Sequence, residues 1–296
     1  MATHLLSDPE IWKNAWKHDP EAGVNRMKRA GMNPLHSFDS YKTAKSFHDQ
    51  AFSEEGRNRA ARIMGWIQSQ GVHFDQISVL DIGAASGGFS IPFAQQGARV
   101  TALEPSKTLT ELMKNSVPPS LKGSINIVQD PFENVNVDEK GWKEKFDLVF
   151  ASMCPAIFGW EMVEKALSCA SQFCYISTIA GPKEHNLIQE LRPVLGVEEE
   201  QAQTSDMFYI MQLLNIYGYS FQTLITRETQ VAVMSLDDAV KNTLGWFEFC
   251  GMPTDRESLL KAEEYLRKTY AGKKIEVRQG GRFGKVLIRL KDQSMG

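Results

Sequence analysis

Residues 79–90, with the sequence VLDIGAASGGFS, decide how the fold of this chain is interpreted. Three apolar residues and one acid resemble the end of a strand, a run of small residues follows, and a helical pattern then begins. Small residues let the backbone turn sharply and let a ligand approach the main-chain N–H groups. The first turn of the next helix presents free N–H donors and the positive end of the helix dipole. The stretch therefore predicts a ligand-binding turn suited to a carboxylate or a phosphate.

The acid at the strand end bears on which ligand this turn binds. A dinucleotide-binding turn requires Gly-x-Gly-x-x-Gly, but counting from Gly83 the second glycine is replaced by Ala85. Asp81 also puts an anion where a pyrophosphate would lie, whereas it suits a ligand that carries an ammonium group. S-adenosylmethionine has an ammonium, a carboxylate and a sulfonium close together. The residues favour this cofactor, and an NAD(P)-type Rossmann oxidoreductase remains the alternative.

Short apolar runs alternate with helical patterns on both sides of this turn, and several of the runs are apolar throughout, as strands buried on both faces should be. This alternation predicts a parallel sheet with helices on both faces. The expected strands cover residues 77–82, 99–103, 124–128, 146–150 and 173–179, and the expected helices lie near residues 88–96, 107–115 and 161–170.

The pattern Asp81-x-Gly83-x-Ala85-x-Gly87 resembles motif I of the class I S-adenosylmethionine-dependent methyltransferases, whose usual form is acid-x-Gly-x-Gly-x-Gly. The resemblance covers about residues 75–180. It implies that S-adenosylmethionine is the cofactor and that the turn, including Ala84, binds it.

The same resemblance assigns cofactor contacts to the ends of three further strands. Glu104, 23 residues after Asp81, is implied to hold both ribose hydroxyls, a task for a carboxylate with two acceptor oxygens. Asp130 and Phe132 are implied to lie at the adenine, and the main chain at the end of the fourth strand is implied to border the methyl-transfer site. The further cofactor-binding residues that it implies are Glu104, Pro105, Asp130, Pro131, Phe132, Ala151 and Ser152.

By analogy with this family the chain is an α/β protein with a three-layer Rossmann-like fold and a mostly parallel seven-stranded sheet. We expect a helical N-terminal cap at residues 1–70 and a Rossmann-like domain at residues 71–296, with a helical insertion at about 235–272 before the last strand. The last, antiparallel strand is expected in a C-terminal hairpin, where Gly280-Gly281 provides a primed turn between residues 274–279 and 282–290.

Neither an obvious nucleophile nor an obvious base stands out. His185 follows the fifth strand and is a candidate general base, but a surface histidine is the commoner case. Cys154 follows the fourth strand, and we interpret it as a small hydrophobic residue rather than a nucleophile.

Composition limits the function classes. A net charge of −3 over 296 residues provides no general field for nucleic acid or an anionic membrane. No apolar run approaches the roughly 18 residues of a membrane span, and the four cysteines show no zinc-binding spacing. We therefore expect a cytoplasmic methyltransferase that needs no metal and has neither nucleic acid nor a membrane as a partner.

The expected reaction is methyl transfer to an O, N, S or C atom of a small molecule, because the segments flanking the Rossmann-like core are large enough to enclose one. A homodimer is compatible with the sequence. A non-catalytic module that binds S-adenosylmethionine is a further alternative, favoured only by the lack of an obvious base.

Overall fold

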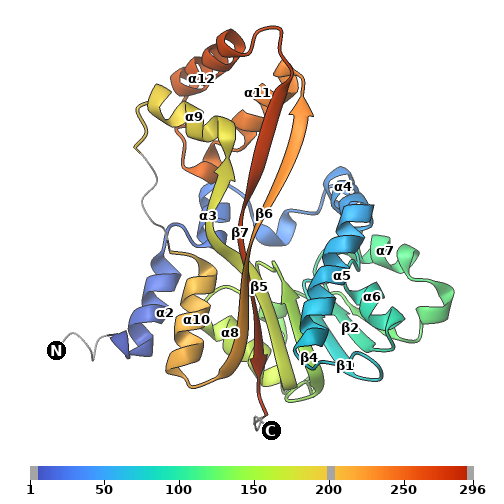
Figure 1. The fold of residues 1–296 in the computed structure, drawn as a ribbon. Helices are drawn as coiled ribbons and strands as arrows, with labels where there is room; N and C mark the ends of the chain where they lie inside the picture. The colour runs from blue at the N-terminus through green and yellow to red at the C-terminus, as the bar shows by residue number, and fades with distance from the viewer. Residues whose placement is uncertain (1–5, 199–203, 292–296) are drawn as a thin grey trace.

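A seven-stranded sheet lies between two layers of helices in the computed structural model, which describes residues 6–198 and 204–291 (Figure 1). The strand order is β3-β2-β1-β4-β5-β7-β6. The strands are β1 (Ser78–Ile82), β2 (Arg99–Leu103), β3 (Ile125–Val128), β4 (Phe146–Ser152), β5 (Ala170–His185), β6 (Ser220–Met234) and β7 (Ile275–Arg289).

The sheet is mixed, which corrects the expectation of a mostly parallel one. The pairs β3–β2, β2–β1, β1–β4 and β4–β5 are parallel, whereas β5–β7 and β7–β6 are antiparallel. The helices between β6 and β7 leave the start of β7 beside the end of β6, where Met234 pairs with Ile275. The chain therefore runs back along β6 as β7, and β7 lies between β5 and β6.

The expected C-terminal hairpin is wrong, because β7 runs without a break through Gly280 and Gly281. These glycines pair with Thr229 and Glu228 of β6. A Cβ atom at Gly280 would lie 2.0 Å from the carbonyl oxygen of Glu228. The glycine pair thus serves a close approach of two strands rather than a turn, which is a second reason for glycine inside a strand.

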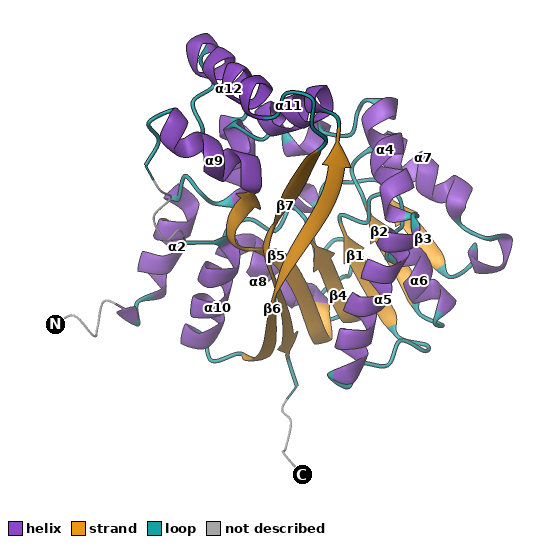
Figure 2. Ribbon diagram, turned by 45° about the horizontal axis from the view of Figure 1, so that its top comes forward, coloured by secondary structure: helices purple, strands orange, loops and turns teal. Residues whose placement is uncertain are grey.

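Each face of the sheet carries its own hydrophobic core, because successive strand side chains point to opposite faces. Leu80 and Val149 pack on one side, and Val79 and Phe150 pack on the other. The first face is covered by α2 (Pro9–His18), α8 (Trp160–Cys169) and α10 (Asp206–Ile216), and the second by α5 (Glu54–Ser69), α6 (Ser90–Gln95) and α7 (Lys107–Ser116) (Figure 2).

The N-terminal helices close over the carboxyl ends of the first strands. They comprise α3 (Gly23–Arg29), η1 (Pro34–His36), α4 (Tyr41–Ala51) and α5, after α2. Ser53 separates α4 from α5 as the N-cap of α5, since its side chain accepts a hydrogen bond from the N–H of Gly56. A Cβ at Gly56 would lie 2.3 Å from the carbonyl oxygen of Ala51, so glycine lets the two helices meet closely.

Strands β5, β6 and β7 extend beyond the other four and carry an upper lobe (Figure 1). Its separate core includes Leu191, Phe247, Leu266 and Val277. The lobe contains α9 (Asn186–Val194), α11 (Leu236–Gly245), η4 (Glu248–Cys250) and α12 (Arg256–Thr269). Outside the lobe, two short 3-10 helices, η2 (Pro119–Leu121) and η3 (Phe132–Asn134), flank β3. Within the described ranges no helix is both long and apolar enough to span a bilayer.

Candidate functional site

The turn after β1 needs small residues because the chain crosses other backbone and side chains at short range. The N–H groups of Gly83 and Ala84 both donate to the carbonyl oxygen of Leu103. Gly83 has φ 71°, and a Cβ added there would lie 2.5 Å from Sγ of Cys154. Ala85 also adopts a positive φ, 49°, which is uncommon for a residue with a Cβ. The bend is therefore tightly held by its neighbours.

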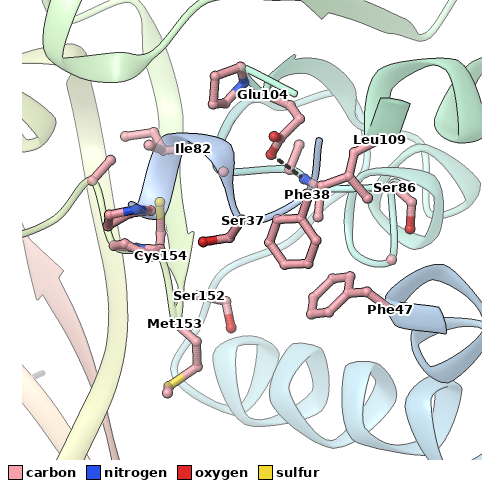
Figure 3. Close-up of a pocket in the computed structure, with 18 of the residues that line it drawn as sticks. Ser37, Phe38, Phe47, Ile82, Ser86, Glu104, Leu109, Ser152, Met153 and Cys154 are labelled. Atoms are coloured by element: carbon pink, nitrogen blue, oxygen red, sulfur yellow. Dashed lines mark hydrogen bonds between the residues drawn. The ribbon is translucent and has the colours of Figure 1, made fainter. Parts of the chain in front are cut away.

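Two acids lie at this bend with their carboxylates inside the protein. Asp81 is 2% exposed and accepts a hydrogen bond of 2.6 Å from Ser90 Oγ. Glu104 is 5% exposed and accepts from the N–H groups of Ala85 and Ser106, each at 2.9 Å. Figure 3 shows the hydrogen bond from the Ala85 N–H to Glu104 as a dashed line.

Burial disfavours the charged form of both acids. It raises the pKa of Asp81 to about 7, against the hydrogen bond from Ser90. It also raises the pKa of Glu104, although the two backbone hydrogen bonds oppose the shift. Neither carboxylate forms an ion pair with a cation of the described residues. A ligand with positive charge would supply what the protein lacks at this point.

A cavity of about 550 Å³ opens beside these acids, within the size range of small-molecule sites. The motif I turn forms one wall, and Phe132 in η3 and Ser152 at the end of β4 contribute others. The N-terminal helices close the remaining side: the rings of Phe38 and Phe47 meet with centroids 5.0 Å apart (Figure 3).

Eight of the predicted cofactor-binding residues are brought together on this cavity: Asp81, Gly83, Ala84, Ala85, Glu104, Pro105, Phe132 and Ser152. Gly87, Asp130, Pro131 and Ala151 are not among its lining residues. Gly87 packs against Met113, Ala151 lies in the core, and Asp130 pairs with Lys140 at 3.7 Å. The adenine contact of Asp130 stays a prediction.

Other lining residues were not in the predicted cofactor set. Glu133, the residue after Phe132, lines the cavity, whereas Asp130 does not. Met27, Leu35 and Leu109 also line it. Helical periodicity marks such apolar residues as core, and only the folding of α3, η1 and α7 around the turn shows that part of that core is a cavity wall.

The two candidate reactive side chains occupy different surroundings. Cys154 lines the cavity, but burial raises its pKa to about 12, so it is a protonated thiol. His185 lies in the upper lobe and lines neither of the two cavities described for this chain. Its Nε2 lies 3.1 Å from Oδ1 of Asn242, its ring packs on Trp246, and burial lowers its pKa. His185 thus lies away from both cavity linings, and its role as a general base stays a prediction.

A second cavity, of about 880 Å³, adjoins the first. The two share Phe47, Ala51, Gly56, Arg59 and Met153 as lining residues. Met153 stands directly after β4 with φ 51° and donates its N–H to the carbonyl oxygen of Ser177. The second cavity then continues between α5 and the long strands β5, β6 and β7.

The residues of the first cavity fit an amino-acid-bearing adenosine. The buried acids suit its ammonium and ribose hydroxyl groups, and Ser86 Oγ is buried on the cavity wall with no hydrogen-bond partner among the residues that the structure describes. A ligand carboxylate would accept from this hydroxyl. No group of three or more metal-ligating side chains occurs in the described part of the chain.

The fold and the site define a class: α/β proteins that bind a nucleoside-type ligand beyond the carboxyl ends of parallel strands. Residues 79–174 match the family model of a methyltransferase domain. This segment is a methyltransferase domain of the class I S-adenosylmethionine-dependent family, whose cofactor is S-adenosylmethionine. No curated protein matches the chain significantly.

Solved structures resemble the chain at low identity. A protein from Bacillus halodurans C-125 that is assigned as a methyltransferase has a TM-score of 0.50 at 12% identity, over 79% of this chain and 99% of that one. Magnesium protoporphyrin IX methyltransferase from Synechocystis PCC 6803, with bound S-adenosylhomocysteine, has a TM-score of 0.46 at 15% identity, over 69% and 94% of the two chains. At 12% identity the likeness to the Bacillus halodurans protein concerns the fold alone.

Proposed function

We propose that the protein transfers the methyl group of S-adenosylmethionine to a small molecule held in the second cavity. The observation that carries this proposal is that the two cavities share a wall at Phe47, Arg59 and Met153. An acceptor in the second cavity can therefore approach a cofactor in the first without leaving the protein.

The cofactor supplies an activated methyl group on a sulfonium, and the chain's residues supply position and surroundings. Asp81 holds the cationic part of the cofactor, Glu104 accepts from the ribose hydroxyls, and Ser86 donates to the carboxylate. Phe38 and Phe47 exclude water from the side of the N-terminal helices. A bound cofactor would supply the methyl group: as the acceptor atom formed its bond to the methyl carbon, the bond from that carbon to the sulfonium sulfur would break, and S-adenosylhomocysteine would leave with the electron pair. The chain's residues would need only to hold both molecules in line.

Calorimetry with S-adenosylhomocysteine tests the cofactor assignment. Glu104→Ala removes the acceptor of two ribose hydroxyls and is expected to weaken binding at least tenfold, since hydrogen bonds to a charged group contribute about 1.5–3 kcal/mol. Glu111→Ala, an exposed acid on α7, is the matched control and should bind as the wild type does. Equal binding by wild type and Glu104→Ala would refute the ribose assignment.

A methyl-labelled donor incubated with the protein and a metabolite extract tests the transfer. Label in a small molecule, absent with Glu104→Ala, supports an enzyme. Binding of S-adenosylhomocysteine with no labelled product in any extract favours a binding module, whereas affinity for NAD alone favours an oxidoreductase.

A further inference from the structure

The second cavity is lined by more cationic than acidic side chains. Four cationic side chains line it, Arg59, Arg62, Lys183 and Arg282, against two acidic ones, Glu55 and Glu228. Both acids are already paired, Glu55 with a cation of the lining and Glu228 with one outside it. Glu55 pairs with Arg62 at 2.8 Å, and Glu228 pairs with Lys285, which lies outside the lining, at 3.2 Å.

Glu228 is held in its charged form by these neighbours. Burial by itself would raise its pKa, but hydrogen bonds from Thr226 and Lys285, together with the charges of Lys285 and Arg59, lower the pKa on balance. Its Oε1 accepts from Thr226 Oγ1 at 2.9 Å. Glu228 therefore accepts its hydrogen bonds from Lys285 and Thr226.

The guanidinium groups of Arg59 and Arg282 are not engaged in an ion pair within the described chain, although the charge of Arg59 acts on Glu228 from a longer distance. Neither makes an ion pair or a hydrogen bond with the residues that the structure describes. Arg59 lies where the two cavities meet, and Arg282 lies in the second cavity only. The stem of Arg282 rests on Gly181 of β5, where a Cβ would be 3.1 Å from Cδ of the arginine. The glycine thus leaves room for this side chain.

The same cavity offers a planar wall and an unsatisfied amide. The Lys183 ammonium lies 5.2 Å from the centre of the Trp246 ring, and both residues line the cavity. Oε1 of Gln279 is buried on the lining with no hydrogen-bond partner in the described ranges. An acceptor with a flat apolar body and a hydrogen-bond donor would satisfy both.

We propose that the methyl acceptor is a small carboxylic acid whose carboxylate is bound by Arg59 and Arg282 while its body lies against Trp246. Guanidinium groups suit this role because their planar donors match a carboxylate. The assignment names the substrate class of the proposed methyltransferase and so rests on that function.

The experiment uses the full-length protein saturated with S-adenosylhomocysteine and matched pairs of probes. Each pair is an acid and its primary amide, built on benzoic, phenylacetic, indole-3-acetic and octanoic skeletons, so that only the charge differs. Ligand-observed NMR ranks binding to the wild type, to Arg282→Gln and to Arg278→Gln. Arg278 is the matched control, an exposed arginine on β7 that pairs with Glu276 and lies outside both cavities.

We expect at least one acid to bind tenfold or more tightly than its amide, Arg282→Gln to remove that preference, and Arg278→Gln to retain it. Acids bound no better than their amides across the panel, or a preference unchanged in Arg282→Gln, overturn the proposal. Calorimetry with S-adenosylhomocysteine separates failure of the proposed methyltransferase function from failure of the proposed substrate class. Failure of the wild type to bind it refutes the methyltransferase, whereas binding without acid preference refutes only the substrate class.

Discussion

Asp81 and Glu104 are buried acids without a cationic partner in the described chain, and each is tolerated for a different reason. Glu104 accepts two backbone hydrogen bonds, which stabilise a carboxylate. Asp81 has the single hydrogen bond from Ser90, and burial raises its pKa to about 7. At the residue scale the site is therefore prepared for a cation, and Asp81 is the group that responds to pH.

Cofactor affinity is expected to rise with pH as Asp81 loses its proton. Below a pKa of about 7 a proton must leave before the ligand ammonium can bind, so affinity for S-adenosylhomocysteine should fall about tenfold per pH unit below that value. Calorimetry from pH 5.5 to 8 measures this. Asp81→Asn should bind weakly with a flat profile, and the same slope in that variant would contradict the assignment.

The raised pKa of Asp81 makes the stability of the ligand-free protein fall with rising pH, whereas cofactor affinity rises. The folded state holds the Asp81 proton more tightly than the unfolded state, whose pKa is near 3.8. The contribution of Asp81 to stability is therefore present below about pH 4 and is lost as the pH rises toward 7. The stabilisation conferred by S-adenosylhomocysteine in thermal unfolding should accordingly be greater at pH 8 than at pH 6.

Ala85 occupies a backbone conformation that favours glycine. An alanine at φ 49° costs about 1–2 kcal/mol, while replacing it by glycine loses about 0.4–1 kcal/mol through the unfolded chain. Ala85→Gly is thus expected to raise the free energy of unfolding by about 0.5 kcal/mol. Urea denaturation measures it, with Ala84→Gly, which has no positive φ, as a control expected to lose stability. Equal losses in both variants would show that Ala85 is not strained.

At the element scale, one acid attaches the N-terminal helices to the rest of the molecule. Asp206, at the first turn of α10, accepts from Trp16 Nε1 at 2.7 Å and from the Gly23 N–H at 2.9 Å. It is 7% exposed, and burial raises its pKa. Since α3 and the loop after it line the cofactor cavity, this contact helps to set the position of that wall.

Asp206→Ala leaves the buried Trp16 donor and the half-buried Gly23 N–H without an acceptor and is expected to cost about 3 kcal/mol of stability. Hydrogen exchange should also become faster in α2 and α3. Asp237→Ala, an exposed acid at the first turn of α11, is the control and should change stability by less than about 1 kcal/mol. Equal effects in the two variants would remove the attachment role of Asp206.

At the scale of the whole molecule, the long strands β5, β6 and β7 join two hydrophobic regions. Below, they belong to the sheet that carries the cofactor cavity, and above, they carry the lobe packed around Phe247 and Leu266 (Figure 1). The second cavity lies along these strands and receives Trp246 from the lobe. The lobe therefore contributes to the second cavity, and none of its described residues lines the first.

Leu266→Ala should destabilise the lobe by about 2–5 kcal/mol, because Leu266 is fully buried in its core. Affinity for S-adenosylhomocysteine should stay within twofold, since no residue of α12 lines the first cavity. Leu260→Ala on the same helix, where the side chain is 56% exposed, is the control. Hydrogen exchange in residues 256–269 reports the loosening of the lobe. A parallel loss of cofactor affinity would contradict the separation of the lobe from the first cavity.

Local signals in the sequence were enough for the parts of the fold that depend on neighbouring residues. The first five strands, three of the helices that follow them and the bend after β1 follow from periodicity and small residues. The signal at Gly280-Gly281 was misleading, because a glycine pair suits both a turn and a close approach of strands, and only the position of β6 distinguishes them.

The sequence by itself determined the parallel part of the sheet and the acids at or just after the ends of its strands, since both depend on residues close together in the chain. Tertiary structure alone decided that β7 lies between β5 and β6, that Glu133 rather than Asp130 faces the cavity, and that Arg59 and Arg282 share a second one. These arrangements join residues up to 223 positions apart, and local patterns carry no information on which distant surfaces will meet.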